Sequence, residues 1–177
     1  VVKIKKNIGY GNGILIGLNK ARGEVLSWTH ADLQTDPADI IIGYKKFKEE
    51  LISKKCIVKG QRRNRNFLDS FFTICMGVYS SLILKSWLYD INAQPKIFHS
   101  SFLEKFKDPP IDFSLDLYVL YFFRFNNVQI KSIPVYFNKR KFGNAKGGGT
   151  LKGKLQLMIR TFSYIHKLNR VLKKWNI

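Results

Sequence analysis

A short apolar run that ends in a cluster of acids constrains the fold of this chain more than any other stretch. Residues 23–37 read Gly-Glu-Val-Leu-Ser-Trp-Thr-His-Ala-Asp-Leu-Gln-Thr-Asp-Pro. The apolar half favours extended backbone, because branched and aromatic side chains suit a pleated surface. Pro37 suits the first turn of a helix, where an amide hydrogen would be unpaired anyway. The sequence therefore predicts a buried strand with Asp32 just beyond its carboxyl end.

Further strands and helices alternate along the chain. Residues 37–54 have apolar side chains at helical spacing, and the short apolar run 56–58 follows them. Short strands are also expected at 97–99 and over 128–137, with a helix from about residue 114 between them. This alternation predicts an α/β fold with a largely parallel sheet. In open sheets of this kind, ligands bind at the carboxyl ends of the strands.

The composition describes one folded domain with a basic surface. The 177 residues include 45% hydrophobic residues, with 31 Lys and Arg against 12 Asp and Glu, for a net charge of +19. Such a charge favours an anionic partner, which leaves nucleic acid, acidic lipid and phosphorylated substrates open. Cys56 and Cys75 have no metal or redox spacing and are interpreted as reduced core residues. We also expect the chain to be a fragment, because residues 1–4 resemble the middle of a strand.

Two segments are candidates to contact phosphate groups. The glycine-rich turn 7–13 precedes a helix, and its glycines would let a phosphate approach the backbone. Its spacing matches no standard phosphate loop, and a plain tight turn is the simpler explanation. The basic run 59–65 follows the strand at 56–58, and its arginines offer forked donors that match phosphate oxygens. A solvated loop is the alternative for this run, although its position near Asp32 favours phosphate binding.

The most apolar segment, residues 67–89, is expected to form a buried or membrane-lying helix. Asp69 and Lys85 shorten its uninterrupted apolar run below the ~20 residues that a membrane span needs. The last segment, 151–177, is predicted to be a basic amphipathic helix, separate from a domain at 1–150. Its apolar residues recur at spacings of three and four. Such a helix could pack on the core of its own domain or lie in the headgroup region of anionic lipid.

An ordered set of short motifs over residues 1–150 resembles glycosyltransferase family 2, and is most similar to the dolichyl- and undecaprenyl-phosphate sugar transferases. The motifs occur in the family's order: Asn7-x-Gly9-x-Gly11, Gly17, Ala21-x-Gly23, Ala31-Asp32-Leu33-Gln34, Asp36-Pro37, Lys59-Gly60-x-Arg62, Asp90 with Ala93-Gln94, Asp116 and Arg140-x-x-Gly143. The resemblance implies a GT-A fold, a Rossmann-like three-layer sandwich with a mostly parallel sheet, here lacking its first two strand–helix units. It also implies Mg or Mn and an inverting transfer from a nucleotide-sugar donor to a polyprenyl-phosphate or glycan acceptor.

The resemblance assigns roles to individual residues. Asp32 matches the second acid of the family's Asp-x-Asp motif, which holds the metal on the donor diphosphate. His30 replaces the first acid; imidazole can ligate Mn but cannot supply the same negative charge. Arg62 and Arg65 are candidates to hold the acceptor phosphate or the departing diphosphate. Asp116 would take the proton of a hydroxyl acceptor, unless it only stabilises the first turn of a helix. The residues expected to bind the donor are Gly9, Gly11, His30, Gln34, Lys59 and Arg140.

Three classes of function follow from the sequence. The resemblance favours a metal-assisted glycosyltransferase in the cytoplasm, held peripherally on the inner face of the membrane. The first alternative is an incomplete or degenerate homologue that acts as a binding or scaffold protein. The second is a basic nucleic-acid-binding protein, which the charge supports but for which the sequence contains no RNA- or DNA-binding motif.

Overall fold

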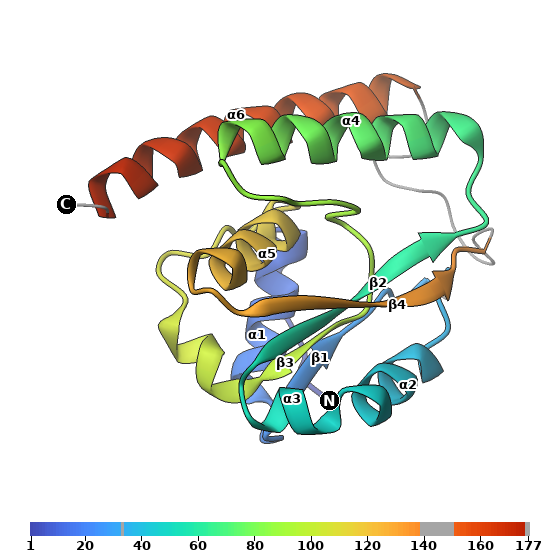
Figure 1. The fold of residues 1–177 in the computed structure, drawn as a ribbon, viewed down its shortest axis with the longest axis vertical. Coiled ribbons are helices and arrows are strands. Elements are labelled where there is room, and N and C mark those ends of the chain that lie inside the picture. Colours follow the sequence, from blue (N-terminus) through green and yellow to red (C-terminus); the bar gives the residue numbers. More distant parts are fainter. Residues whose placement is uncertain (33, 139–150, 176–177) are drawn as a thin grey trace.

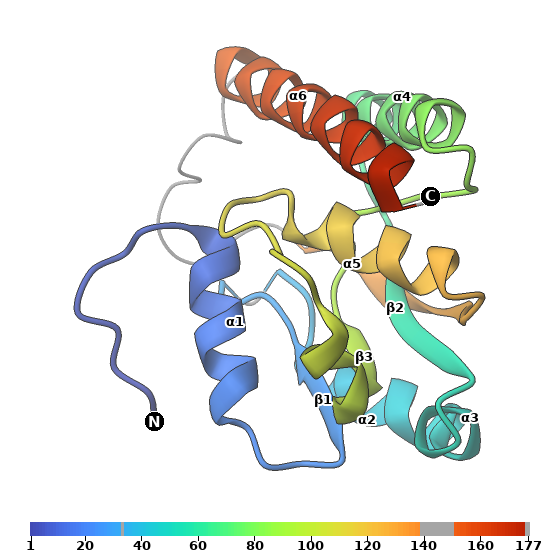
Figure 2. The same ribbon diagram turned by 90° about the vertical axis from the view of Figure 1, so that its left-hand side faces the viewer.

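The computed structural model describes residues 1–32, 34–138 and 151–175, which form a mixed α/β fold around one open sheet (Figure 1). Helices cover both faces of the sheet, with α2 and α3 on one side and α1 and α5 on the other (Figures 1 and 2). In chain order the elements are α1 (Tyr10–Lys20), β1 (Val25–Trp28), α2 (Ala38–Lys46), α3 (Lys48–Ile52), β2 (Cys56–Arg63), α4 (Phe67–Ile83), β3 (Lys96–His99), the 3₁₀ helix η1 (Ser100–Lys105), α5 (Leu115–Phe125), β4 (Gln129–Tyr136) and α6 (Leu151–Trp175).

Within the described part of the chain, the sheet has four strands in the order β1-β3-β2-β4. Strands β2 and β4 pair in parallel, whereas β3 is antiparallel to both of its neighbours. The expectation of a mostly parallel sheet is therefore wrong. Helix α4 runs back above the sheet in an outer layer, and the segment after it, residues 84–95, returns the chain to the carboxyl end of β2, where Asp90 contacts Arg62 (Figure 1). The chain consequently re-enters the sheet from the carboxyl end of β2, and β3 has to run in the opposite direction.

The remaining three strands still run in one direction. Since β3 is antiparallel to β1 and to β2, these two strands point the same way, and β4 is parallel to β2. The carboxyl ends of β1, β2 and β4 therefore lie at the same edge of the sheet. This edge is where an open sheet of this kind is expected to bind its ligand.

The core occupies both faces of the sheet. On one face α5 is almost entirely buried, and its Phe123 packs against Phe98 of β3 with ring centroids 5.6 Å apart. On the other face α2 approaches so closely that a Cβ on Gly43 would lie 2.7 Å from Cδ1 of Ile97. Residues 1–4, expected to be a strand, have no regular structure, and Val1 is fully exposed. Both cysteines are free.

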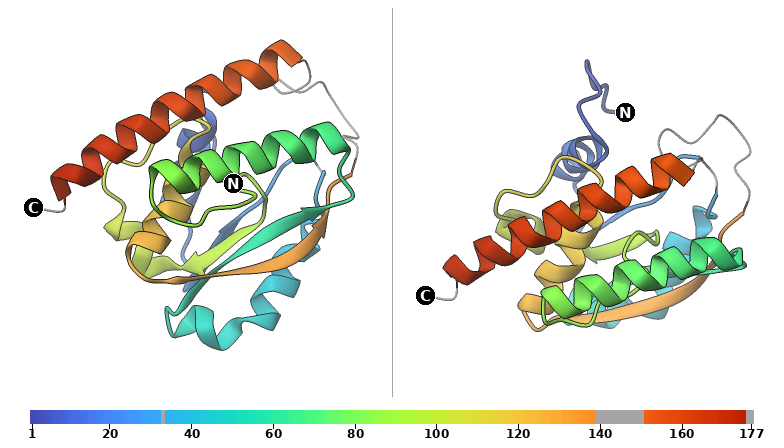
Figure 3. Two further views of the ribbon diagram at one scale, coloured as in Figure 1. Left: turned by 45° about the horizontal axis from the view of Figure 1, so that its top comes forward. Right: turned by 90° about the horizontal axis from the view of Figure 1, so that it is seen from above.

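Helices α4 and α6 pack side by side and form the outermost layer of the fold (Figure 3). Tyr79 of α4 contacts two residues of α6. Its ring centroid lies 4.4 Å from that of Phe162, and its hydroxyl oxygen is 2.6 Å from Nε2 of His166. Ile165 and Leu168 are buried in the main core. Helix α6 therefore packs on its own domain, one of the two arrangements that its amphipathic pattern allowed. Among the described residues, no helix has the length and apolar character needed to cross a bilayer.

Candidate functional site

Segments that are distant in sequence meet around the ring of Phe137, directly after β4. His30, which follows β1, lies edge-on to this ring, with the two ring centroids 6.2 Å apart. The guanidinium carbons of Arg62 and Arg65 lie 5.6 and 5.7 Å from the same centroid. The expected strand at 56–58 is longer than predicted: β2 runs to Arg63, so most of the basic run 59–65 lies in the strand and not in a loop. Its end nevertheless lies on the same side of the sheet as the loop carrying Asp32, as expected.

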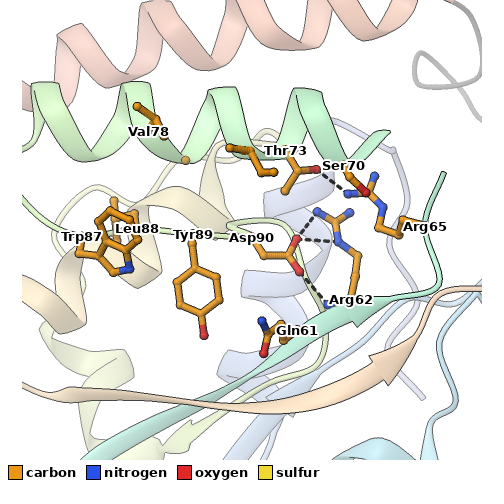
Figure 4. Close-up of a pocket in the computed structure, with 12 residues that line it drawn as sticks. Gln61, Arg62, Arg65, Ser70, Thr73, Val78, Trp87, Leu88, Tyr89 and Asp90 are labelled. Carbon is orange, nitrogen blue, oxygen red and sulfur yellow. Dashed lines mark hydrogen bonds and ion pairs between the residues drawn. The ribbon is translucent and has the colours of Figure 1, made fainter. Parts of the chain in front are cut away.

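Arg62 is held by Asp90, which lies in the loop between α4 and β3 (Figure 4). Its Nε donates to Oδ1 of Asp90 at 2.8 Å, its Nη2 pairs with the same oxygen, and its backbone amide donates to Oδ2 at 2.7 Å. Burial acts to raise the pKa of Asp90, but the charge and hydrogen bonds of Arg62 outweigh it and hold that pKa below its ordinary value. The pair therefore stays ionised and fixes the guanidinium plane.

Arg65 lies beside Arg62 with part of its hydrogen-bonding capacity unused. Its Nη1 donates to the hydroxyl of Thr73 in α4, whereas its Nε is buried and has no hydrogen-bond partner among the described residues. Burial, followed by the charge of Arg62, lowers the pKa of Arg65. An anion bound beside Arg65 would relieve the repulsion between the two guanidinium groups.

A cavity of about 330 Å³ lies between α4 and the end of β2. Figure 4 shows that its two ends differ, with charged and hydroxyl side chains at one end and apolar side chains at the other. The polar end is lined by Arg62, Arg65, Ser70, Thr73 and Asp90, and the apolar end by Ile74, Gly77, Val78, Trp87 and Leu88. The cavity therefore suits a molecule with an anionic group and an apolar portion.

The loop after β1 is fastened to the end of β4. Asp32 accepts a hydrogen bond at Oδ1 from the amide of Gln34, at 3.1 Å. Gln34 in turn donates from Nε2 to the carbonyl of Asn138 at 3.2 Å, and its own carbonyl accepts from the amide of Asn138 at 2.8 Å. Gln34 therefore orders the loop that carries the expected metal ligands. Arg140 lies outside the described residues.

His30 and Asp32 form an incomplete set of metal ligands. Burial lowers the pKa of His30 while the charge of Asp32 opposes the shift, so the imidazole is neutral at pH 7, the form that binds metals. Its Nε2 is buried without a hydrogen-bond partner in the described part of the chain. No group of three or more His, Cys, Asp or Glu gathers among the described residues. The two side chains fit Mg or Mn only where phosphate oxygens and water complete the coordination, which is usual for Mg.

Asp116 lies beneath the site in a buried network and is 1% exposed. Its Oδ1 accepts from Nζ of Lys96 at 2.9 Å and from Nε2 of Gln94 at 2.8 Å, and its Oδ2 accepts from the hydroxyl of Tyr10 at 3.0 Å. Both carboxylate oxygens are thus used within the fold. This geometry favours a structural role, and the proposed role of Asp116 as a base finds no support in it.

Gly9 and Gly11 serve the packing of α1 against residues 110–112. A Cβ on Gly9, whose φ is 153°, would lie 2.3 Å from the carbonyl oxygen of Ile111, and one on Gly11 would lie 2.5 Å from that of Pro110. The backbone amide of Asn12 donates to the carbonyl oxygen of Ile111 at 2.8 Å. The loop backbone thus lies against the turn where a phosphate was expected, and a donor-binding role for these glycines remains a prediction.

No protein-family model and no curated protein matches the chain. The assignment of function therefore depends on the geometry of this edge and on the motifs in the sequence.

Sequence reasoning missed two features of the site. Phe137 could have been found, because it directly follows β4 and so lies at the same edge as the other strand ends. Asp90 was recognised only as part of a motif, since its contact with Arg62 spans 28 residues and depends on the path of α4. Lys59, expected to bind the donor, is instead 1% exposed beneath the cavity.

Proposed function

We propose that the chain transfers a sugar from a nucleotide-sugar donor to a polyprenyl phosphate, as a family 2 glycosyltransferase with a GT-A fold. The cavity carries this proposal, because it joins two guanidinium groups to an apolar wall. The phosphate of the acceptor would lie at Arg62 and Arg65, and its first isoprene units against Ile74 and Val78. A glycan acceptor is polar and would make no matching contact with the apolar wall of the cavity.

The proposed chemistry asks little of the chain beyond positioning. A polyprenyl phosphate is already an anion at neutral pH, so its oxygen can attack the anomeric carbon without a base. The new bond to phosphate oxygen forms as the bond to the donor diphosphate breaks, and the sugar carbon is inverted. Arg62 and Arg65 reduce the repulsion between the two anions. When bound at His30 and Asp32, Mg or Mn would neutralise charge on the departing diphosphate.

The proposal predicts that Arg62→Met weakens the binding of farnesyl phosphate at least tenfold. A charge-assisted hydrogen bond contributes about 1.5–3 kcal/mol, and the substitution removes such donors from the polar end of the cavity. Calorimetric titration measures the effect. Arg63→Met is the matched control, since Arg63 is the adjacent residue, is exposed, and does not line the cavity. Because Arg62→Met leaves Asp90 unpaired, Arg65→Met provides an independent check.

Equal affinities for the wild type and both cavity variants would exclude this acceptor site. An assay with a panel of nucleotide sugars, Mn and a polyprenyl phosphate then tests the transfer itself. Binding without transfer from any donor would replace the proposed activity with the alternative of a binding or scaffold protein.

The exposed face of α4 supports peripheral binding to an anionic membrane. Two of its residues, Ile74 and Val78, line the cavity and are also 63% and 46% exposed, so the cavity opens on this face. Neighbouring α6 exposes basic residues that suit acidic lipid. The apolar face of α4 consists of Phe67, Leu68, Phe71, Ile74, Val78 and Leu82, and the described basic residues exposed on α6 are Arg160, Lys167 and Arg170.

We expect the double variant Phe71→Ser/Leu82→Ser to lose flotation with liposomes that contain acidic lipid. Each such side chain contributes about 1.5–3 kcal/mol when it leaves water. Ile41→Ser/Ile42→Ser is the matched control, because these residues are 54% and 56% exposed on α2, across the sheet. Raising the salt concentration should weaken flotation of the wild type by screening the basic residues. If the α4 and α2 variants float equally well, α4 is not the membrane-binding face.

A further inference from the structure

Lys59 is buried directly beneath the polar end of the cavity. It is 1% exposed, and its Nζ donates to the carbonyls of Gly60 at 3.0 Å and Asp90 at 3.1 Å. The same Nζ lies 4.3 Å from the ring centroid of Tyr89. Lys59 forms none of the ion pairs found among the described residues. Its ammonium group therefore depends on two carbonyl oxygens and an aromatic face.

Lys59 is connected to the cavity through Asp90 and Tyr89, two residues that line it. Asp90 has a φ of 41°, a left-handed conformation that residues with a side chain seldom adopt. In this conformation its carbonyl accepts from Lys59 while its carboxylate holds Arg62. Tyr89, on which Nζ of Lys59 rests, also lines the cavity. A change at Lys59 thus reaches the Arg62 guanidinium through Asp90, in addition to the direct effect of the charge of Lys59.

We propose that Lys59 is a positioning residue: its ammonium group holds Asp90, and so presents Arg62 to an anionic head group. Anion binding at Arg62 weakens when Lys59 loses its proton. The inference rests on the anion-binding part of the proposed function and not on sugar transfer. The neutral amine keeps two N–H groups for the carbonyls of Gly60 and Asp90, but loss of the proton removes the positive charge that strengthens these hydrogen bonds and attracts the anion.

The protonation change falls in an accessible range of pH. Burial lowers the pKa of Lys59 to about 7. The charges of Asp90 and of Asp116 in α5 oppose this shift, and those of Lys96 in β3 and Arg62 reinforce it. The residue opposite on β4 is Ser132, which carries no charge.

Two other titrating groups lie nearby. The pKa of His30 is lowered from its ordinary 6.5, so this imidazole is already neutral above pH 7. Burial also lowers the pKa of Lys96, which is paired with Asp116. A variant at Lys59 is therefore needed to separate its titration from that of Lys96.

Sulfate is a suitable probe, because its charge is constant between pH 6 and pH 9. We expect the wild-type affinity for sulfate, followed by the fluorescence of Trp87 in the cavity wall, to fall about tenfold across this range with a midpoint near 7. Lys59→Met should bind weakly at every pH and show no such transition. Lys55→Met, an exposed lysine just before β2, should keep the wild-type profile.

A second measurement, made on the wild type alone, does not depend on whether the variants fold. The ¹⁵N resonance of Arg62 Nε should shift with the same midpoint, because this atom donates to Asp90. An unchanged pH profile in Lys59→Met, or a flat profile in the wild type, overturns the proposal for Lys59. If Arg62→Met also leaves sulfate binding unchanged, the anion site itself is absent, and the proposed function fails with it.

Discussion

Asp116→Asn is expected to lower the free energy of unfolding by about 3–5 kcal/mol, measured by denaturant unfolding. The substitution removes the carboxylate that pairs with Lys96 at 2.9 Å, where the two side chains are 1% and 0% exposed. An unpaired ammonium group then stays buried, or Lys96 is forced to give up its proton. The loss is large because the interaction partner disappears while the burial of the charge remains.

Two further variants test this explanation. Asp108→Asn, at an exposed position, should change the stability by less than about 0.5 kcal/mol. Lys96→Met/Asp116→Leu should recover part of the loss, because it removes both buried charges. The recovery is incomplete because Tyr10 and Gln94 lose the carboxylate as an acceptor. A small loss of stability in Asp116→Asn, combined with abolished sugar transfer, would contradict the structural role and restore Asp116 as a catalytic base.

The stability of the wild type should rise between pH 7 and pH 10 by up to about 1.4 kcal/mol per pH unit more than that of Lys59→Met. The pKa of Lys59 is about 7 in the folded chain against an ordinary 10.5, so the unfolded chain binds one more proton throughout this range. Stability therefore increases with pH until the unfolded state also loses the proton. Below pH 7 the lysine is protonated in both states, and the burial of its charge is fully unfavourable.

Denaturant unfolding of both proteins at several pH values measures this difference. Lys96 is present in both proteins, so the difference between the two curves reports Lys59 together with its electrostatic coupling to Lys96. Lys55→Met should follow the wild type, since Lys55 is exposed. Parallel curves for the wild type and Lys59→Met would show that Lys59 keeps its ordinary pKa in the folded chain.

The positions of the strands could be predicted from the sequence, but one strand direction could not. Apolar runs located β1, β3 and β4 to within a few residues and the start of β2, because burial leaves a local pattern. The basic second half of β2 was predicted to be a loop. The direction of β3 depends on where α4 lies, which no local pattern encodes. The strand predicted at residues 1–4 does not form. A strand needs a neighbouring strand to pair with, which the local sequence does not specify, and Val1 has none in the described structure.

The sequence predicted those parts of the site whose position follows from the end of a strand. The segments that carry Asp32 and Arg62 were expected at one edge because each follows a strand. The burial of Lys59 was not, because it depends on the loop before β3 lying directly on β2. The loop lies so close to β2 that a Cβ on Gly60 would be 2.0 Å from the carbonyl oxygen of Gln94. A basic residue before this glycine looks like a surface residue in the sequence and becomes an interior one by tertiary contact.

Because Ile74 and Val78 belong both to the cavity wall and to the exposed face of α4, a lipid ligand would not have to pass through water. Its tail could remain among the acyl chains while only the head and nearest carbons move sideways into the protein. Occupancy would then follow the number of lipid molecules per unit of membrane area and not their concentration in solution. The distal isoprenoid units would lie beyond the protein, so prenyl phosphates of very different lengths would compete for this cavity on nearly equal terms.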